Sequence, residues 1–166
     1  EKMRLDESGR LLINTTTSRI VEDSVGNGPQ GLIQIEAADS VAIMSIISAG
    51  TNDANRCGTI NLGRHRNSNV GATPTIVQSG DALGSIVFSG GDGTDMRTRG
   101  ATIIAACDGS PAENQMPTRL VIGTNAGSGS VTERLRIDSR GSFQFSNGFM
   151  NETVNINTTA RTGTQA

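Results

Sequence analysis

Apolar and polar residues alternate in two copies of the same short pattern, one at the start of the chain and one near its end. Residues 1–9 and residues 133–141 both read Glu, basic, apolar, Arg, apolar, Asp, two polar residues and Gly. Alternation with period 2 predicts a strand with one buried face, and the Gly supplies the positive φ of a tight turn. A second short stretch with apolar residues follows in each copy, at 10–13 and 142–145. Each copy therefore predicts a β-hairpin, and the hairpins begin 132 residues apart (133 minus 1).

The repeat also predicts matching structural roles for two pairs of charged residues. Arg4 with Asp6, and Arg136 with Asp138, occupy equivalent places in the two copies. Because residues two apart share a strand face, each pair should lie opposite the buried apolar face, within reach of a neighbouring strand or chain. Two hairpins with unrelated folds would contradict this interpretation.

Further short stretches with strand character fill the chain between and after the hairpins. Clusters of Gly, Asn, Asp and Pro separate them, for example at residues 27–29 and 90–93, and such clusters mark turns. Residues 41–47 carry apolar side chains on both faces, which indicates burial between two layers or two chains. No segment shows a convincing period of 3.6, so the pattern predicts an all-β fold of short strands. The predicted strands are 32–36, 41–47, 59–64, 84–89, 101–106, 119–123 and 153–157.

The composition changes this picture in one respect, the size of the core. The 166 residues include no Trp, no Tyr and only four Phe, so the large rings that usually dominate core burial are missing. Ile, Val and Thr are plentiful, and these residues pack well on pleated sheets. We therefore expect a modest core that another chain completes. Since the chain begins inside the first hairpin pattern and without Met, we also expect a fragment or a processed product.

The charge and hydropathy patterns argue against two classes of partner. The net charge is −2, whereas general nucleic-acid binding needs a basic surface. No apolar stretch is long enough to cross a membrane, and no signal-peptide pattern is visible. The sequence therefore predicts no nucleic-acid partner and no membrane insertion.

The cysteines and one glycine-rich string were considered as metal sites. Cys57 and Cys107 are the only cysteines and form no cluster with metal-ligand spacing; we expect two buried or half-buried thiols, and the spacing leaves a disulfide open. Residues 90–95 match the first six places of the calcium-binding nonapeptide of β-rolls. Arg97 occupies the eighth place, which should be apolar, and the string occurs once. It predicts an Asp-Gly turn, and no metal ligand or cofactor is expected.

Two arginine pairs are candidates for contact with an anion. On a strand, Arg64 and Arg66 would share one face with His65 on the other, and Arg97 and Arg99 repeat this spacing. One interpretation is contact with phosphate on a bacterial surface polysaccharide. The other is structural pairing, which we favour because bidentate arginine pairs can hold neighbouring chains in register. No receptor-binding residue is assigned.

Catalysis has little support in the sequence. His65 is the only histidine, and no Ser or Cys nucleophile is linked to it by a recognised pattern. Glycan hydrolysis needs two carboxylates at a set separation, and the absence of Trp and Tyr weakens a sugar-stacking groove. The sequence predicts a protein without catalytic residues.

Several uncommon strings between residues 59 and 146 occur in a characteristic order and spacing. They lie at 62–66, 77–86, 91–95, 103–109, 114–121 and 132–137. Together they resemble a module of tailed-bacteriophage tail fibres. Residues 161–166 resemble the approach to the self-cleaving intramolecular chaperone domain at the C-terminus of such fibres. The resemblance implies an elongated, intertwined homotrimeric β-fibre that is made in the host cytoplasm and incorporated in the virion.

This resemblance also suggests how the chain is divided. Residues 1–14 would end a preceding β-module, and 15–58 would form a less recognisable β-rich segment. Residues 59–146 would form the tail-fibre module that ends in the second hairpin, and 147–166 a stem towards a missing C-terminal domain.

The function implied by the resemblance is structural support and host attachment without enzymatic activity. The implied partners are further copies of the chain, other virion tail proteins, and a bacterial surface polysaccharide or outer-membrane receptor. The repeated hairpin favours a shaft element, whereas a place close to the C-terminal domain favours the receptor-binding tip. A polysaccharide-degrading tailspike enzyme and a bacterial adhesin stalk are the alternatives.

Overall fold

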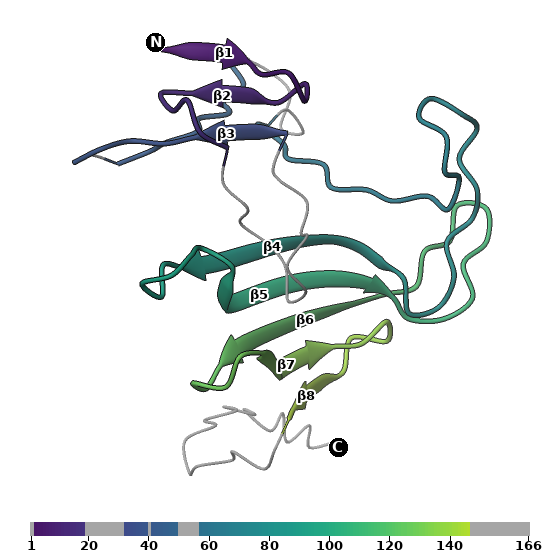
Figure 1. The fold of residues 1–166 in the computed structure, drawn as a ribbon. Coiled ribbons are helices and arrows are strands. Elements are labelled where there is room, and N and C mark those ends of the chain that lie inside the picture. Colours follow the sequence, from purple (N-terminus) through teal and green to yellow (C-terminus); the bar gives the residue numbers. More distant parts are fainter. Residues whose placement is uncertain (1, 19–31, 40, 50–56, 147–166) are drawn as a thin grey trace, which may run out of the picture.

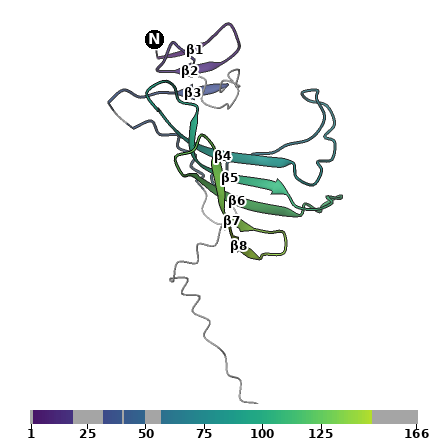
Figure 2. The ribbon, with the colours of Figure 1, turned by 60° about the horizontal axis from the view of Figure 1, so that its bottom comes forward.

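The computed structural model describes residues 2–18, 32–39, 41–49 and 57–146. These residues form eight strands and no helix (Figure 1), so the predicted all-β fold is confirmed and no helix in the described part could span a membrane. The strands form two sheets and follow one another along one direction, from β1 to β8 (Figures 1 and 2). They are β1 (Met3–Leu5), β2 (Leu11–Ile13), β3 (Ile33–Ile35), β4 (Ala82–Gly90), β5 (Thr98–Cys107), β6 (Thr118–Asn125), β7 (Val131–Ile137) and β8 (Phe143–Phe145).

The first sheet has the order β1-β2-β3. Strands β1 and β2 form an antiparallel hairpin, and β3 pairs with β2 in parallel, with Leu12 opposite Gln34. The Gln34 side chain is buried and donates a hydrogen bond to the Ser18 hydroxyl (2.9 Å).

The second sheet is a five-stranded antiparallel meander with the order β4-β5-β6-β7-β8. Each strand pairs with its neighbour in the sequence, as expected where short turns join antiparallel strands. Register shifts interrupt the ladder near Gly84, near Phe88 and at Gly123. At Gly123 an added Cβ would lie 2.5 Å from the Val131 Cγ1 atom, so only glycine allows this close approach of β6 and β7.

The two hairpins predicted from the repeat have the same register. Met3 pairs with Ile13 in the first hairpin, and Leu135 pairs with Phe145 in the second, with both members 132 positions further on. The remaining two pairs of each hairpin follow the same offset. The prediction that the hairpins fold alike is confirmed.

In the first hairpin, the Asp6 side chain organises the turn. Its Oδ1 atom accepts hydrogen bonds from the backbone N–H groups of Ser8 (2.9 Å) and Arg10 (3.0 Å). The Arg10 guanidinium pairs with Oδ2, and Gly9 has a φ of 75°. These bonds, led by the one from the Arg10 backbone, lower the pKa of Asp6.

The turn of the second hairpin repeats this arrangement. Asp138 Oδ1 accepts hydrogen bonds from the backbone N–H groups of Arg140 and Ser142, both at 2.9 Å. The Arg140 side chain pairs with Oδ2 (3.0 Å), and Gly141 has a φ of 83°. The pKa of Asp138 is lowered, chiefly by the bond from the Ser142 backbone. The two aspartates therefore have matching roles, as predicted, but these roles lie in the turns and not on a strand face. Their arginine partners are Arg10 and Arg140, whereas Arg136 pairs with Glu133.

Two predicted strands are absent from the described structure. Residues 41–47 and 59–64 belong to neither sheet. The expected turn at 27–29, the expected strand at 153–157 and the stem 147–166 lie outside the described residues. The proposed division into segments stays a prediction.

The core of the single chain is small. Among the described residues, the buried apolar side chains are Leu12, Val77, Ala106 and Cys107. Cys57 is exposed, so the expectation of a covered thiol is wrong for this residue, and neither cysteine forms a disulfide. Cys57 lies in a segment that packs into neither sheet, whereas Cys107 ends β5 beneath the turn that follows it.

Candidate subunit interface and surface sites

The first sheet has one face made only of apolar side chains. Leu5 on this face is 71% exposed, whereas Leu12 on the other face is 1% exposed. The prediction that the apolar face of the hairpin is buried is therefore wrong within the single chain, because nothing described covers that face. The pairing of the three strands places six residues on it: Met3, Ile13 and Ile35 in one row, and Leu5, Leu11 and Ile33 in the next.

The second sheet also has an apolar face, and it is larger. Phe143 on this face is 66% exposed, and Ile86, Phe88 and Phe145 are exposed as well. A contiguous apolar patch across five strands is rare on a soluble monomer and marks a contact surface. The apolar face of the second sheet comprises Ile86, Phe88, Ile103, Leu120, Ile122, Leu135, Ile137, Phe143 and Phe145.

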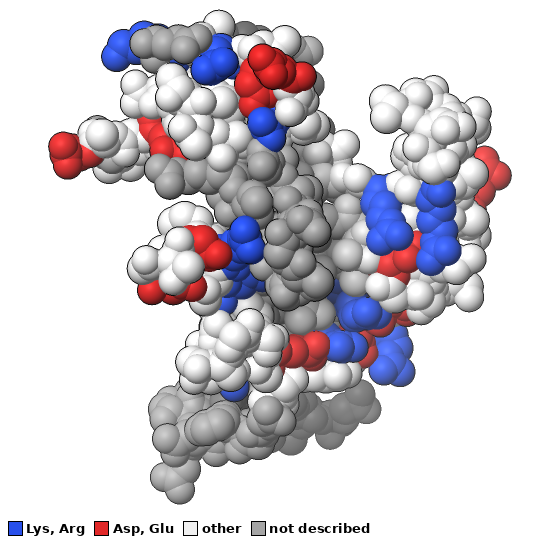
Figure 3. Space-filling model, in the orientation of Figure 1, with Lys and Arg blue, Asp and Glu red and all other residues white. Residues whose placement is uncertain are grey.

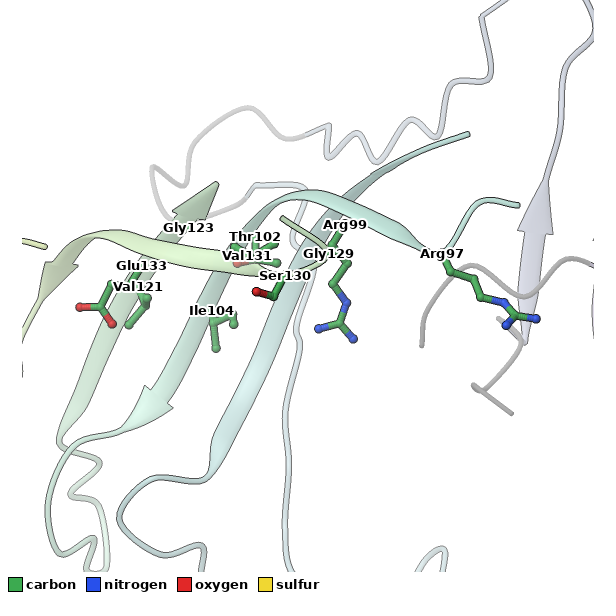
Figure 4. A pocket seen from close by; sticks show the side chains of 10 residues that line it. All are labelled: Arg97, Arg99, Thr102, Ile104, Val121, Gly123, Gly129, Ser130, Val131 and Glu133. Carbon is green, nitrogen blue, oxygen red and sulfur yellow. The ribbon is translucent and has the colours of Figure 1, made fainter. Parts of the chain in front are cut away.

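The opposite face of the second sheet carries both polar and apolar side chains and has a hollow of about 380 Å³. Figure 4 shows Arg99 and Glu133 towards opposite ends of this hollow, with Ile104 between them and Arg97 further out. The Glu133 carboxylate accepts two hydrogen bonds from the Arg136 guanidinium (2.9 and 2.8 Å). This pairing lowers the pKa of Glu133, so the carboxylate stays ionised.

The two predicted arginine pairs have different surroundings. The Arg66 guanidinium binds the nearly buried Asp81 carboxylate with two hydrogen bonds (2.7 and 2.9 Å), and Arg64 lies 3.5 Å from it. The Arg66 contact, followed by the Gln78 backbone N–H, holds the pKa of Asp81 well below its usual range. These arginines close the loop before β4. On the face shown in Figure 3, basic and acidic side chains lie side by side in several places.

His65 and Arg97 also make local contacts. The His65 Nδ1 atom accepts a hydrogen bond from the Asn67 backbone N–H (3.1 Å), and the Arg97 Nε atom lies 3.4 Å from the Asp95 carboxylate. Arg64 and Arg66 therefore have an acidic partner within the chain, whereas the buried Arg97 Nε atom makes no hydrogen bond among the described residues.

The glycine-rich string at 90–95 forms the turn between β4 and β5. Asp92 Oδ1 accepts hydrogen bonds from the backbone N–H groups of Thr94 (2.9 Å) and Asp95 (3.1 Å), and Oδ2 from the Thr98 hydroxyl (2.6 Å). These bonds, led by that from Thr98, lower the pKa of Asp92 to about 2. Both carboxylate oxygens therefore accept hydrogen bonds from the turn. Within the described ranges, no group of three or more His, Cys, Asp or Glu side chains is placed to hold a metal ion.

The comparisons with known proteins agree with this architecture. No protein-family model matches the chain, and no curated protein matches it either. Solved structures do match it, among them the carboxy-terminal domain of the bacteriophage T5 L-shaped tail fibre, and the same domain with its intramolecular chaperone domain. Each similarity covers 92% of this chain with a TM-score of 0.65, at 18% and 17% sequence identity.

The present chain spans 61% and 42% of the length of those two chains. At this level of identity, the similarity concerns the fold. It confirms the resemblance to a tail-fibre module that the ordered strings predicted. The chain has the fold of a bacteriophage tail-fibre domain.

Proposed function

We propose that this chain is a structural and host-attachment segment of a bacteriophage tail fibre. It acts as a homotrimer in the virion and positions, or makes, the contact with the bacterial surface. The observation that carries the proposal is the pair of exposed apolar sheet faces on a chain with a tail-fibre fold.

A homotrimer would cover the apolar faces that are exposed in the single chain. Large apolar side chains are exposed on both sheets, while the described core holds only a few residues. Each copy carries the same faces, so copies arranged in a closed ring cover one another. A narrow axis has little room, and small and β-branched side chains fit there better than Trp and Tyr, which this chain lacks. Three copies are the number that the tail-fibre resemblance implies.

The outward-facing surface of the trimer is available to bind partners other than copies of the chain. With the apolar faces turned to the axis, the opposite face of the second sheet, which carries Arg99 and Glu133, points outward in every copy. The partners are other virion tail proteins and a surface polysaccharide or outer-membrane receptor of the host. The protein is synthesised in the host cytoplasm together with the rest of the virion.

The carboxyl groups support a function without catalysis. Glycoside hydrolases keep one carboxyl group protonated by raising its pKa. Among the described residues, the carboxyl groups whose pKa this fold shifts are shifted downward, and each accepts hydrogen bonds from a turn or from an arginine; they are Asp6, Asp81, Asp92, Asp108, Glu133 and Asp138.

Binding to host cells tests the attachment function. The trimer, labelled with a fluorophore, is incubated with bacteria that the phage infects and with mutants lacking surface polysaccharide or outer-membrane proteins. We expect saturable binding that is lost in one mutant class and that competes with phage adsorption. A trimer that binds no susceptible strain would assign the segment to the shaft. Shortened polysaccharide chains after incubation would instead support the tailspike enzyme.

A further inference from the structure

The hollow on the second sheet combines aliphatic, hydroxyl and charged side chains. Ile104 of β5 and Val121 of β6 pair across the two strands and line the hollow with aliphatic groups. Its volume of about 380 Å³ lies within the range of small-molecule sites in proteins, about 300–1,000 Å³. The hollow can therefore hold a sugar unit. Its polar lining includes Thr102, Arg97, Arg99 and Glu133.

Two β-bulges bring charged side chains to this face of the sheet. The ladder between β4 and β5 skips Gly100, so Arg99 lies on the same face as Thr102 instead of the apolar face. The ladder between β6 and β7 skips Arg134, and Glu133 thereby reaches the hollow in the same way. Bulges that redirect side chains are frequent next to functional sites. The two register shifts thus place a cation and an anion in one hollow.

A buried hydroxyl group also lines the hollow. Thr102 is only 4% exposed, and its hydroxyl makes no hydrogen bond within the described residues. A Cβ atom added at Gly123 would lie 3.2 Å from the Thr102 Oγ1 atom, so glycine at this position leaves space beside the hydroxyl. A buried polar group without a partner costs free energy. A polar group of a ligand in the hollow would supply that partner.

The charges are separated along the hollow, with the arginines on one side and Glu133 on the other (Figure 4). Arg97 contacts Asp95 only through a long ion pair of 3.4 Å, without a hydrogen bond at its Nε atom. Guanidinium groups bind carboxylate and phosphate groups well. Glu133 is ionised and held by Arg136, so its oxygens accept hydrogen bonds from hydroxyl groups. The arrangement suits a ligand with an anionic group at one end and hydroxyl groups at the other.

We infer that this hollow binds a sugar unit that carries a carboxylate or phosphate group. The anionic group lies at Arg97 and Arg99, and the sugar hydroxyls reach Thr102 and Glu133. The C–H groups of the ring pack on the aliphatic side chains of β5 and β6. This inference rests on the proposed attachment function, in which this face of the sheet points outward and meets the surface polysaccharide of the host.

Methyl NMR spectroscopy of the full chain tests the site. The protein, labelled at its Ile and Val methyl groups, is titrated with glucuronic acid, glucose 6-phosphate, glucose and inorganic phosphate. We expect saturable shifts of the Ile104 and Val121 methyl signals with glucuronic acid or glucose 6-phosphate. The methyl groups of Val70, at a fully exposed position in the loop before β4, should not shift. The first two probes distinguish a carboxylate from a phosphate.

The other two probes and the location of the shifts provide the contradicting results. An equal response to inorganic phosphate would show that the hollow binds a free anion, and an equal response to glucose would show that the charge is not recognised. Either result would overturn the inference. Shifts confined to the apolar face of the second sheet, or no shifts with either anionic sugar, would overturn it as well.

Two substitutions with matched controls provide a second readout. Arg99→Gln should weaken binding of the anionic sugar about tenfold, as expected for the loss of one hydrogen bond to a charged group. Arg64→Gln removes the same charge from the loop before β4 and should leave the affinity unchanged.

Thr102→Val keeps the shape of the side chain and should weaken binding about threefold, because a neutral hydrogen bond is lost. Thr73→Val, at an exposed loop position, is its control. If Arg99→Gln and Thr102→Val kept both the wild-type methyl spectrum and the wild-type affinity, the hollow would not be the site.

The outcomes also separate this inference from the proposed function. A trimer that binds host cells while its hollow responds to neither anionic sugar would overturn the site and leave the attachment function intact. A hollow that binds the sugar in a trimer that binds no susceptible strain would support the site and contradict the attachment function.

Discussion

The two hairpins have the same turn and the same register but different neighbours. The first is extended on the β2 side by the parallel strand β3, and the second on the β7 side by three antiparallel strands. The turn of the second is also tethered: Asp108 accepts hydrogen bonds from the Arg119 guanidinium and from the Ser139 backbone N–H, both at 3.0 Å. No such tether from another element to the turn of the first hairpin is present among the described residues.

The comparison separates the local determinants of the hairpin from the long-range contacts that cover it. The aspartate and glycine of each turn fix the hairpin whatever lies beside it. The apolar face of the hairpin, in contrast, is uncovered in both places, although the second hairpin belongs to a sheet of five strands. Additional strands of the same chain widen this face and do not cover it, and this points to neighbouring copies as the cover.

The largest expected effect comes from a charge on the equivalent apolar positions Leu5 and Ile137. Both Leu5→Asp and Ile137→Asp should dissociate the trimer, because each buried aliphatic side chain contributes about 1.5–3 kcal/mol in every copy. Ile137→Asp should be the more disruptive, since Leu120 and Phe143 flank it on both sides, whereas β1 is an edge strand. Light scattering after size exclusion measures the effect. Two harmless substitutions would contradict the interface, and Val70→Asp is the control.

A smaller effect is expected from the turn aspartates. Asp138→Ala removes the acceptor for the backbone N–H groups of Arg140 and Ser142 and with it the hydrogen bonds that hold the turn. The melting temperature should fall by several degrees, and Asp6→Ala should cause a similar fall. Ser139→Ala, at an exposed neighbouring position, should have little effect. If only one aspartate variant lost stability, the two turns would not be equivalent.

The turn glycines should contribute less to the free energy of unfolding than the turn aspartates do, and the two glycines should contribute equally. No atom lies within 4 Å of a Cβ placed on Gly9 or Gly141, so alanine there would meet only the strain of a positive φ, about 1 kcal/mol. Gly90→Ala, in open space without a positive φ, should be neutral. Chemical denaturation of the three variants measures the differences. Unequal costs at Gly9 and Gly141 would contradict the shared turn geometry.

The smallest expected effect is on the stability of the fold at acidic pH. The pKa values of Asp6 and Asp138 are lowered from 3.8 in the folded chain. A lowered carboxyl pKa adds stability that is present above the unfolded pKa and is lost as the pH falls through the folded pKa. Stability should therefore decline below about pH 4, and each of the Asp6→Ala and Asp138→Ala variants should decline less steeply. Parallel acid denaturation curves for wild type and both variants would refute this contribution.

Local sequence patterns predicted the parts of the fold that local interactions determine. Strands β4 to β8 and both hairpins follow from alternation between Gly- and Asp-containing turns, such as the turn at Asp92. The parallel pairing of β3 with β2 could not be predicted, because two strands of three residues carry no signal for their partner. The close approach at Gly123 was likewise invisible, since it depends on Val131 of the next strand.

The remaining differences, between the burial that the sequence predicts and the exposure in the single chain, have one physical cause. Residues 41–47 have the pattern of a buried strand, and Leu5 and Ile137 have the pattern of a buried face. For 41–47 the pattern predicted burial between two layers or two chains, and it does not distinguish a partner in the same chain from one in another copy. The pattern specifies what is buried in the assembly, and the sequence does not state which copy supplies the cover. The exposure of apolar side chains in the single chain therefore locates the candidate interface on the apolar faces of the two sheets.

The mass of the protein in solution tests the central claim most directly. Sedimentation equilibrium of the chain at micromolar concentration should give three times the chain mass of 17.2 kDa, with no dissociation on dilution through that range. A single species of 17.2 kDa that unfolds cooperatively would contradict the account, because it would show that the apolar faces of both sheets are stable in water without another copy.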